Sequence, residues 1–334
     1  MPVRPAPSLD LLAIGESLRD VFYLLHEATV SCSLHKDQCL LCLEYAEKIP
    51  VEQVTKVQAA GNAANAAVGA ARLGLRSGLV SWVGTDNAGV DIQATLKQEG
   101  VHVGCVMSDK TRPTSEATIL MFQGERTQLV YFQPRTYALP RLPKAKAIYY
   151  TAMGKPSTKF DAALLKELQA NPQTLFTFQP GTTHVRLGLA PLKKLIARSD
   201  LFILNKDEAH VILGDGERTM CNLLSAFHHL GAKHVVITDG KNGADASDGS
   251  THWHMPIFPG EAKERTGAGD SFATALTVAM VQGKDLPEAL RMGTANSWSV
   301  VREIGPQAGL LTTAKMKAVL QKFKTIKPTI HKHT

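Results

Sequence analysis

The sequence predicts an α/β protein of three layers, α/β/α, in which helices cover both faces of a mostly parallel central sheet and a small β-sheet forms a lid. Two observations predict this fold. Short, almost wholly apolar runs alternate with segments of helical length, as expected for parallel strands buried on both faces. The alternation is interrupted twice by β-prone segments without helices. The apolar runs are Leu11–Gly15, Leu79–Gly84, Ile148–Thr151, Leu175–Phe178, Leu201–Leu204 and Val235–Thr238.

The two interruptions divide the chain into a core and a lid. In the second interruption, two alternating segments flank Gly124-Glu125-Arg126 as the strands of a hairpin would. Within the core, helices are expected over residues 61–74, 159–170, 186–197 and 286–301. The predicted division is a lid of residues 21–58 and 112–133, a core of residues 1–20, 59–111 and 134–320, and a basic C-terminal tail of residues 321–334.

The composition is that of an ordinary soluble globular protein, with 44% hydrophobic and 20% charged residues. No apolar run approaches the roughly 18 residues of a membrane span, and no signal peptide opens the chain. We therefore expect no membrane partner. Five cysteines in 334 residues do not make a disulfide framework, which favours a cytoplasmic, reducing location.

The net charge of +7 is concentrated at the C-terminus. From Lys315 to Thr334 there are six lysines and no acidic residue, which leaves about +1 on the rest of the chain. A basic segment that binds nucleic acid usually carries aromatic residues among its charges, and here Phe323 stands alone. We therefore expect no nucleic-acid partner.

A glycine-rich turn, Gly267-Ala268-Gly269, leads into an apolar helix. Small residues let backbone amides approach a ligand, and the free amides of a first helical turn attract anions, most often phosphate. Asp270 follows, and a carboxylate beside an anion site is unfavourable unless it accepts a proton during a reaction. The alternative is a capped helix with an aspartate in its first turn. Because no other phosphate-binding motif is present, this turn is the candidate phosphate site.

Thr266-Gly267-Ala268-Gly269-Asp270 resembles the C-terminal signature of the ribokinase-like (PfkB) family of sugar and nucleoside kinases. The resemblance implies the ribokinase-like fold with its β-lid. It also implies that the amides of Gly267, Ala268 and Gly269 form an anion hole for the transferred phosphoryl group, with Asp270 as the catalytic base. Many members bind a monovalent cation beside this loop, where their Asp-Thr is replaced here by Glu264-Arg265.

Three residues are candidates for binding the acceptor. Asp20 follows the first strand, at the edge where open α/β sheets bind ligands, and the resemblance assigns its carboxylate to sugar hydroxyls. Ala60-Gly61-x-x-x-Asn65 is similar to the family's Gly-Gly-x-x-x-Asn motif, which implies that Gly61 and Asn65 contact the substrate. The alternative for Asp20 is an aspartate that only forms part of a turn after the strand. The alternative for Asn65 is an asparagine that only caps a helix start.

Another group of residues is assigned to ATP and Mg²⁺. Asn205 and Glu208 match the family's Asn-x-x-Glu motif, associated with Mg²⁺ held largely through water, which suits an ion that keeps its hydration shell. The same spacing is also a helix-capping pattern. Residues 304–309 are expected to wall the adenine pocket. The remaining residues that the resemblance assigns to the nucleotide are Thr238, Gly240, Gly243 and Asn296.

Cys32, Cys39 and Cys42 have the composition of a structural zinc site, with His35 or His26 as a fourth ligand. The alternative is a set of free thiols in the lid.

The sequence thus predicts an ATP-dependent kinase that phosphorylates a hydroxymethyl group of a sugar. The alternatives are a nucleoside kinase of the same fold, which would use the equivalent 5′-hydroxyl, and a non-catalytic sugar-binding homologue. The exposed edges of a β-lid invite pairing, so a homodimer through the lid is also expected.

Overall fold

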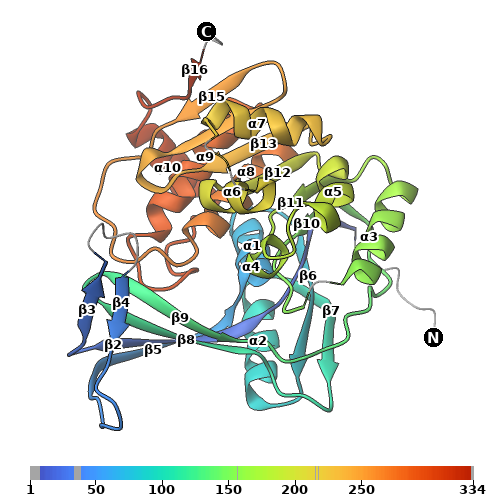
Figure 1. The fold of residues 1–334 in the computed structure, drawn as a ribbon. Helices are drawn as coiled ribbons and strands as arrows, with labels where there is room; N and C mark the ends of the chain where they lie inside the picture. The colour runs from blue at the N-terminus through green and yellow to red at the C-terminus, as the bar shows by residue number, and fades with distance from the viewer. Residues whose placement is uncertain (1–7, 34–38, 156, 215, 217, 332–334) are drawn as a thin grey trace.

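The computed structural model describes residues 8–331 except residues 34–38, 156, 215 and 217. It has the predicted α/β fold, with a large sheet between helical layers and a separate small sheet beneath it (Figure 1). In the described part of the chain, no helix is both long and apolar enough to cross a membrane.

Ten strands of the described residues form the main sheet. Side chains of its first strand alternate between the two faces: Leu11 and Ala13 join one buried core, Leu12 and Ile14 the other. In spatial order the strands are β16 (Thr329–His331), β15 (His252–Met255), β14 (Ala244–Ser247), β13 (His234–Thr238), β12 (Leu201–Asn205), β11 (Leu175–Phe178), β10 (Ala145–Tyr150), β1 (Leu9–Ile14), β6 (Ser77–Gly84) and β7 (His102–Asp109). Neighbours from β13 to β7 are parallel, and β14, β15 and β16 close one edge antiparallel.

Helices cover both faces of this sheet, as predicted. One layer contains α1 (Asn62–Arg72), α2 (Asn87–Gln98), α8 (Ala268–Val281), α9 (Leu286–Val300) and α10 (Thr313–Lys322). The other contains α3 (Thr158–Ala170), α5 (Leu189–Arg198), α6 (Lys206–Leu213) and α7 (Met220–His229). The helix expected over 186–197 begins later, at Leu189, because Gly188 (φ 72°) is the N-cap of α5 and separates it from the short α4 (Thr182–Val185).

The lid is a four-stranded sheet in the order β5-β2-β8-β9, formed by β5 (Val51–Ala60), β2 (Leu18–Leu25), β8 (Glu116–Phe122) and β9 (Glu125–Tyr131). Leu18, Phe22 and Ile119 form its own small core. A hairpin of β3 (Thr29–Cys32) and β4 (Cys39–Cys42) lies at its outer end (Figure 1). Because β2 begins at Leu18, Asp20 lies within a lid strand and not in a turn after the first core strand.

The C-terminal segment, expected to be a basic tail, is partly built into the core. Phe323 is buried, and its ring lies 4.5 Å from the Phe258 ring, between centroids. Strand β16 then pairs with β15 through residues 329–331. The sequence pattern did not predict this strand, because a three-residue edge strand is too short to show alternation.

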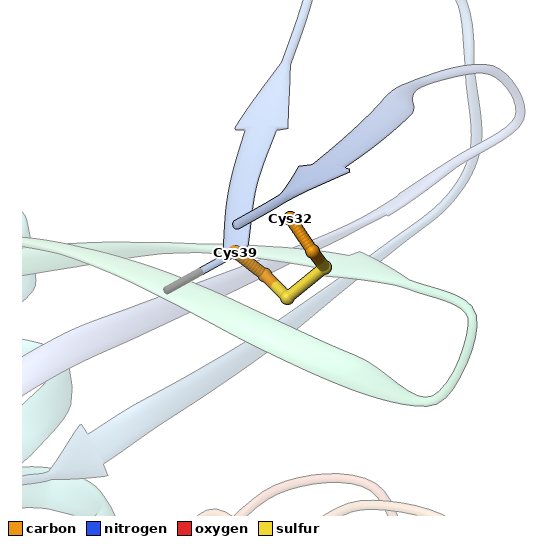
Figure 2. The surroundings of a disulfide bond; sticks show 2 residues. All are labelled: Cys32 and Cys39. Carbon is orange, nitrogen blue, oxygen red and sulfur yellow. A yellow bond between two sulfur atoms is a disulfide. The ribbon is translucent and has the colours of Figure 1, made fainter. Parts of the chain in front are cut away.

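The zinc site predicted from Cys32, Cys39 and Cys42 is not supported by the structure. Cys32 and Cys39 face each other across the β3–β4 hairpin and form a disulfide (Figure 2). Metal ligation needs thiolates, and bonded sulfur atoms are no longer thiolates. Cys42 is a free, exposed cysteine, and His35 lies outside the described residues. The same disulfide runs against the expectation, drawn from cysteine usage, of a reducing location.

Candidate active site

A cavity of about 650 Å³ opens between the lid and the carboxyl ends of the core strands. It is lined by lid strands, the start of α1, the segments that follow β11 and β12, and the start of α8. The sequence-predicted residues that line it are Asp20, Gly61, Asn65, Asn205, Glu208, Thr238, Gly267, Gly269 and Asp270. Positions from all parts of the chain therefore converge on one site.

The start of α8 has the backbone geometry of an anion site. Gly267 is the N-cap, with φ 78°, and a Cβ there would lie 2.5 Å from the Cβ of Pro306, so glycine is required. At Gly269, a Cβ would meet only Gln179 Nε2 among the described residues, at 3.8 Å, which leaves the backbone accessible from the cavity. The amides of a first helical turn have no partner within the helix.

Asp270 does not cap this helix through its side chain. Its two carboxylate oxygens instead accept hydrogen bonds from the side-chain amides of Asn62 and Asn65, each at 2.9 Å. Burial raises the pKa of Asp270, while these two donors and the charge of Arg126 act in the opposite direction. The result is a carboxylate fixed in orientation and basic for its type, which are the properties of a general base.

Asn65 is itself held in place. Its side-chain oxygen accepts a hydrogen bond of 2.9 Å from Gln307, whose amide also donates to the carbonyl of Ala59. Because an amide that accepts through oxygen presents its nitrogen to the other side, this contact fixes which end of Asn65 faces Asp270. Gln307 is therefore a positioning residue for the carboxylate.

Two ion pairs join the lid to the loop before α8. Arg126 lies 3.6 Å from the carboxylate of Glu264, and Arg265 lies 3.3 Å from that of Glu125. Both arginines line the cavity, together with Arg186. The cavity is therefore bordered by three guanidinium groups, a feature that the sequence reasoning missed.

Asp20 is 7% exposed and faces the cavity from β2. Burial, followed by the negative charges of Asp270 and Glu264, raises the pKa of Asp20 to about 7. Nearby, Gly61 precedes α1 with φ 98°, and a Cβ there would lie 2.6 Å from the carbonyl oxygen of Glu16. Only glycine fits at this position, because any side chain would meet the backbone of Glu16.

The opposite wall contains Asn205 and Glu208, which form a capping box at the start of α6. The Glu208 amide donates to the Asn205 side chain at 2.8 Å, and the Asn205 amide donates to Glu208 Oε2 at 2.9 Å. Burial is the main cause that raises the pKa of Glu208. Thr238 ends the neighbouring strand and also lines the cavity.

Four predicted residues do not line the cavity. The Ala268 amide donates to the carbonyl of Arg265 at 3.3 Å. Gly240 and Gly243 lie in the turn after β13, outside the cavity. Asn296 is fully buried, where it donates to the Ser271 carbonyl and accepts from the Leu311 amide. Its side chain joins two helices and a loop.

Conversely, several residues that line the cavity or help to hold Asp270 were not predicted from the sequence. Asn62 directly follows Gly61 and lies one helical turn before Asn65. This pair of asparagines on one side of a helix start is a signal from which Asn62 could have been predicted. Arg126 was assigned to the hairpin turn, because the true turn, at Gln123 and Gly124 with positive φ, lies just before it. Gln307 was expected in the wall of the adenine pocket, but no residue of 304–309 is among those that line the cavity. Its contact with Asn65 had no signal in the sequence, since the two residues are distant in the chain.

Comparison with known proteins finds sugar and sugar-phosphate kinases among the proteins similar to this chain. The chain is 29% identical over 272 residues to ribokinase from Bacillus subtilis (strain 168), covering 78% of this chain and 87% of that protein. It is 25% identical over 331 residues to an ATP-dependent 6-phosphofructokinase from Thermoanaerobacterium thermosaccharolyticum, covering 94% and 95%. The fold is similar to that of Arabidopsis thaliana ribokinase complexed with ribose and ATP, with a TM-score of 0.78, 20% identity and coverage of 94% and 99%.

The pfkB family carbohydrate kinase model matches residues 27–313, a range that includes the start of α8, Asp270 and the asparagines that hold it. The chain therefore belongs to the PfkB family of carbohydrate kinases.

Proposed function

We propose that this kinase transfers the γ-phosphoryl group of ATP to a hydroxymethyl group of a sugar, with Asp270 as the general base. The observation that carries the proposal is the Asp270 carboxylate, oriented by Asn62 and Asn65 at the start of α8, beside the Gly267 and Gly269 backbone. An anion site and a proton acceptor next to each other are what phosphoryl transfer to an alcohol requires.

In the proposed reaction, the substrate oxygen attacks the γ-phosphorus, and the bond from that phosphorus to the β–γ bridging oxygen breaks, releasing ADP. The hydroxyl proton moves to Asp270. The amides of Gly267 and Gly269 stabilise the charge on the transferring group. The Ala268 amide, which already has a carbonyl partner, contributes less than the sequence resemblance implied.

Asp20 and Asn65 are proposed to bind the acceptor. Asp20 faces the cavity from the lid, and its carboxylate accepts hydrogen bonds from hydroxyl groups. Asn65 already uses its oxygen on Gln307 and one amide hydrogen on Asp270. Its remaining capacity is therefore one donor and one acceptor site, and its main role is to orient the base.

The family implies Mg²⁺ with the nucleotide, and the residues at the cavity wall fit it. Glu208 lines the cavity and keeps one carboxylate oxygen, Oε1, outside the capping box, which suits contact through water. Bound there, the ion would neutralise charge on the β- and γ-phosphates. For a monovalent cation, the candidate ligand is Glu264, whose buried Oε2 has no hydrogen-bond partner among the described residues.

A second candidate acceptor is a sugar that already carries a phosphate. Arg126, Arg186 and Arg265 border the cavity, and guanidinium groups bind phosphate well. A nucleoside remains the third candidate, since it offers the same kind of hydroxyl. A screen of sugars, sugar phosphates and nucleosides for acceptor-dependent ATP consumption separates the three.

The proposal is tested with Asp270→Asn. Turnover is expected to fall by roughly 10²–10⁴-fold, because an amide cannot take the proton. ATP affinity should stay the same or increase, since a negative charge near the γ-phosphate is lost. The melting temperature should change little. Kinetics, nucleotide titration and thermal melting measure the three effects.

Asp285→Asn is the matched control, because Asp285 is a true N-cap whose side chain accepts from the Glu288 amide. That variant should keep full turnover. Near-normal turnover in Asp270→Asn would contradict the assignment of the base.

A further inference from the structure

A second cluster of titratable side chains lies at the antiparallel edge of the main sheet, outside the active-site cavity. Asp245 of β14, His254 of β15 and His331 of β16 each offer one possible ligand atom, and these atoms lie within 4.8 Å of one another. The strand register explains the grouping: Asp245 is directly opposite His254, and His331 is opposite His252. His252 and His254, two residues apart on β15, share one face of the strand.

The contacts within this cluster are close. Asp245 is 7% exposed and uses both carboxylate oxygens, one 2.7 Å from His252 Nε2 and the other 3.1 Å from His254 Nδ1. The ring of His331 stacks on that of His252, with centroids 4.8 Å apart, and meets the ring of His254 edge-on at 5.7 Å. On the far side, His252 Nδ1 lies 3.4 Å from Cys221 Sγ.

The side chains of this cluster favour one class of metal ion. Imidazole nitrogens with one carboxylate suit zinc and its neighbours among the transition metals, whereas Mg²⁺ and Ca²⁺ select oxygen ligands. We propose that Asp245, His254 and His331 bind one divalent transition-metal ion of the Zn²⁺ class. His252 is then a positioning residue, which holds the carboxylate through Oδ1 as outer-shell partners of metal ligands do.

The proposed site must contract on binding. Two ligand atoms on a tetrahedral zinc ion with bonds of ~2.1 Å lie ~3.4 Å apart, and the present upper separation is 4.8 Å. Asp245 and His254 are already at 3.1 Å. The residue that must move on binding is therefore His331, which is exposed and belongs to the edge strand β16. Binding would pin β16 to β15 and so fix the C-terminal end of the fold.

The competing interpretation is a cluster held only by hydrogen bonds and ring contacts. The experiment uses the full chain, freed of metal with a chelator and dialysed without nucleotide, and titrated with Co²⁺ and then Zn²⁺. We expect one ion per chain, the visible absorption of tetrahedral Co²⁺, its loss when Zn²⁺ displaces it, and a melting temperature that rises with Zn²⁺ concentration.

His331→Ala and His254→Ala should each weaken binding at least tenfold. His229→Ala is the matched control: this histidine of α7 is exposed, bonds only within its own helix in the described structure, and should bind metal like the unchanged chain. His331→Ala alters an exposed residue, so in chelator it should melt like the unchanged chain. His254→Gln serves as the second variant if His254→Ala does not fold.

Two results would overturn the proposal. One is a chain that retains no Co²⁺ or Zn²⁺ after dialysis. The other is binding that survives the combined His254→Ala and His331→Ala changes, which would locate the metal elsewhere, for example at Cys42.

Discussion

Asp20 shows how the cavity alters a single carboxyl group. Its pKa of about 7 arises first from burial and then from the charges of Asp270 and Glu264. Asp20 is thus costly to ionise in the folded chain, and under the proposed function hydroxyl groups of the acceptor would be its hydrogen-bond partners.

Asp20→Asn should change how stability depends on pH. Between about pH 4 and pH 7, folded Asp20 retains a proton that the unfolded chain releases, so its contribution to stability falls as pH rises through this window. Asparagine cannot ionise, so the variant should lose less stability than the unchanged chain between pH 5 and pH 8. Urea unfolding at both pH values measures this.

The control for that experiment is Asp91→Asn, at an exposed position on α2. It should follow the unchanged chain at both pH values. Parallel pH profiles for Asp20→Asn and the unchanged chain would show that Asp20 ionises normally in the folded state.

Helices and strands that follow from a local pattern of residues were predicted well from the sequence. Features that depend on partners far away in the chain were not. The buried parallel strands and the Ala-rich α1 follow from runs of apolar residues that are fully covered. Strand β7 was missed, because its residues alternate only weakly in burial at the sheet edge. The glycine-rich turn before α8 could be identified as a candidate anion site from its residues alone. Asn62, Arg126 and Gln307 could not, because each acts through a residue more than 100 positions away.

Strand β9 leads to a prediction about the lid. Arg126 of this strand lies close to Glu264, and its positive charge opposes the rise in the pKa of Asp270 that burial causes. Arg126→Gln should raise the KM for the acceptor severalfold and leave the KM for ATP nearly unchanged, because the proposed acceptor site lies next to the lid strands that line the cavity. Arg112→Gln, at an exposed position outside the cavity, is the control. A rise in the KM for ATP alone would instead assign Arg126 to the nucleotide, and an equal rise for both substrates would contradict an acceptor-specific role.

At the scale of the whole molecule, the lid has an edge strand with exposed apolar side chains. β9 is an edge strand, and Leu129 and Tyr131 on it are 57% and 61% exposed. Unpaired edges with apolar side chains favour pairing with a second copy. We therefore predict a homodimer through the lid.

Light scattering should give the mass of a dimer, and the double change Leu129→Lys and Tyr131→Lys should give a monomer. Val90→Lys, at an exposed valine of α2, should leave the dimer intact. A monomeric unchanged chain at high concentration would remove the prediction.

The bond between Asn65 and Asp270 also has a consequence for biosynthesis. The two residues are 205 positions apart, and a ribosome adding about 5–20 residues per second needs roughly 10–40 s to cover that distance. Throughout that time the emerging α1 lacks α8, the helix against which its small residues pack, with Gly69 meeting Thr274. Asn62 and Asn65 therefore have no partner for these two hydrogen bonds until α8 is synthesised, and a nascent fragment that ends before α8 lacks the carboxylate that they hold.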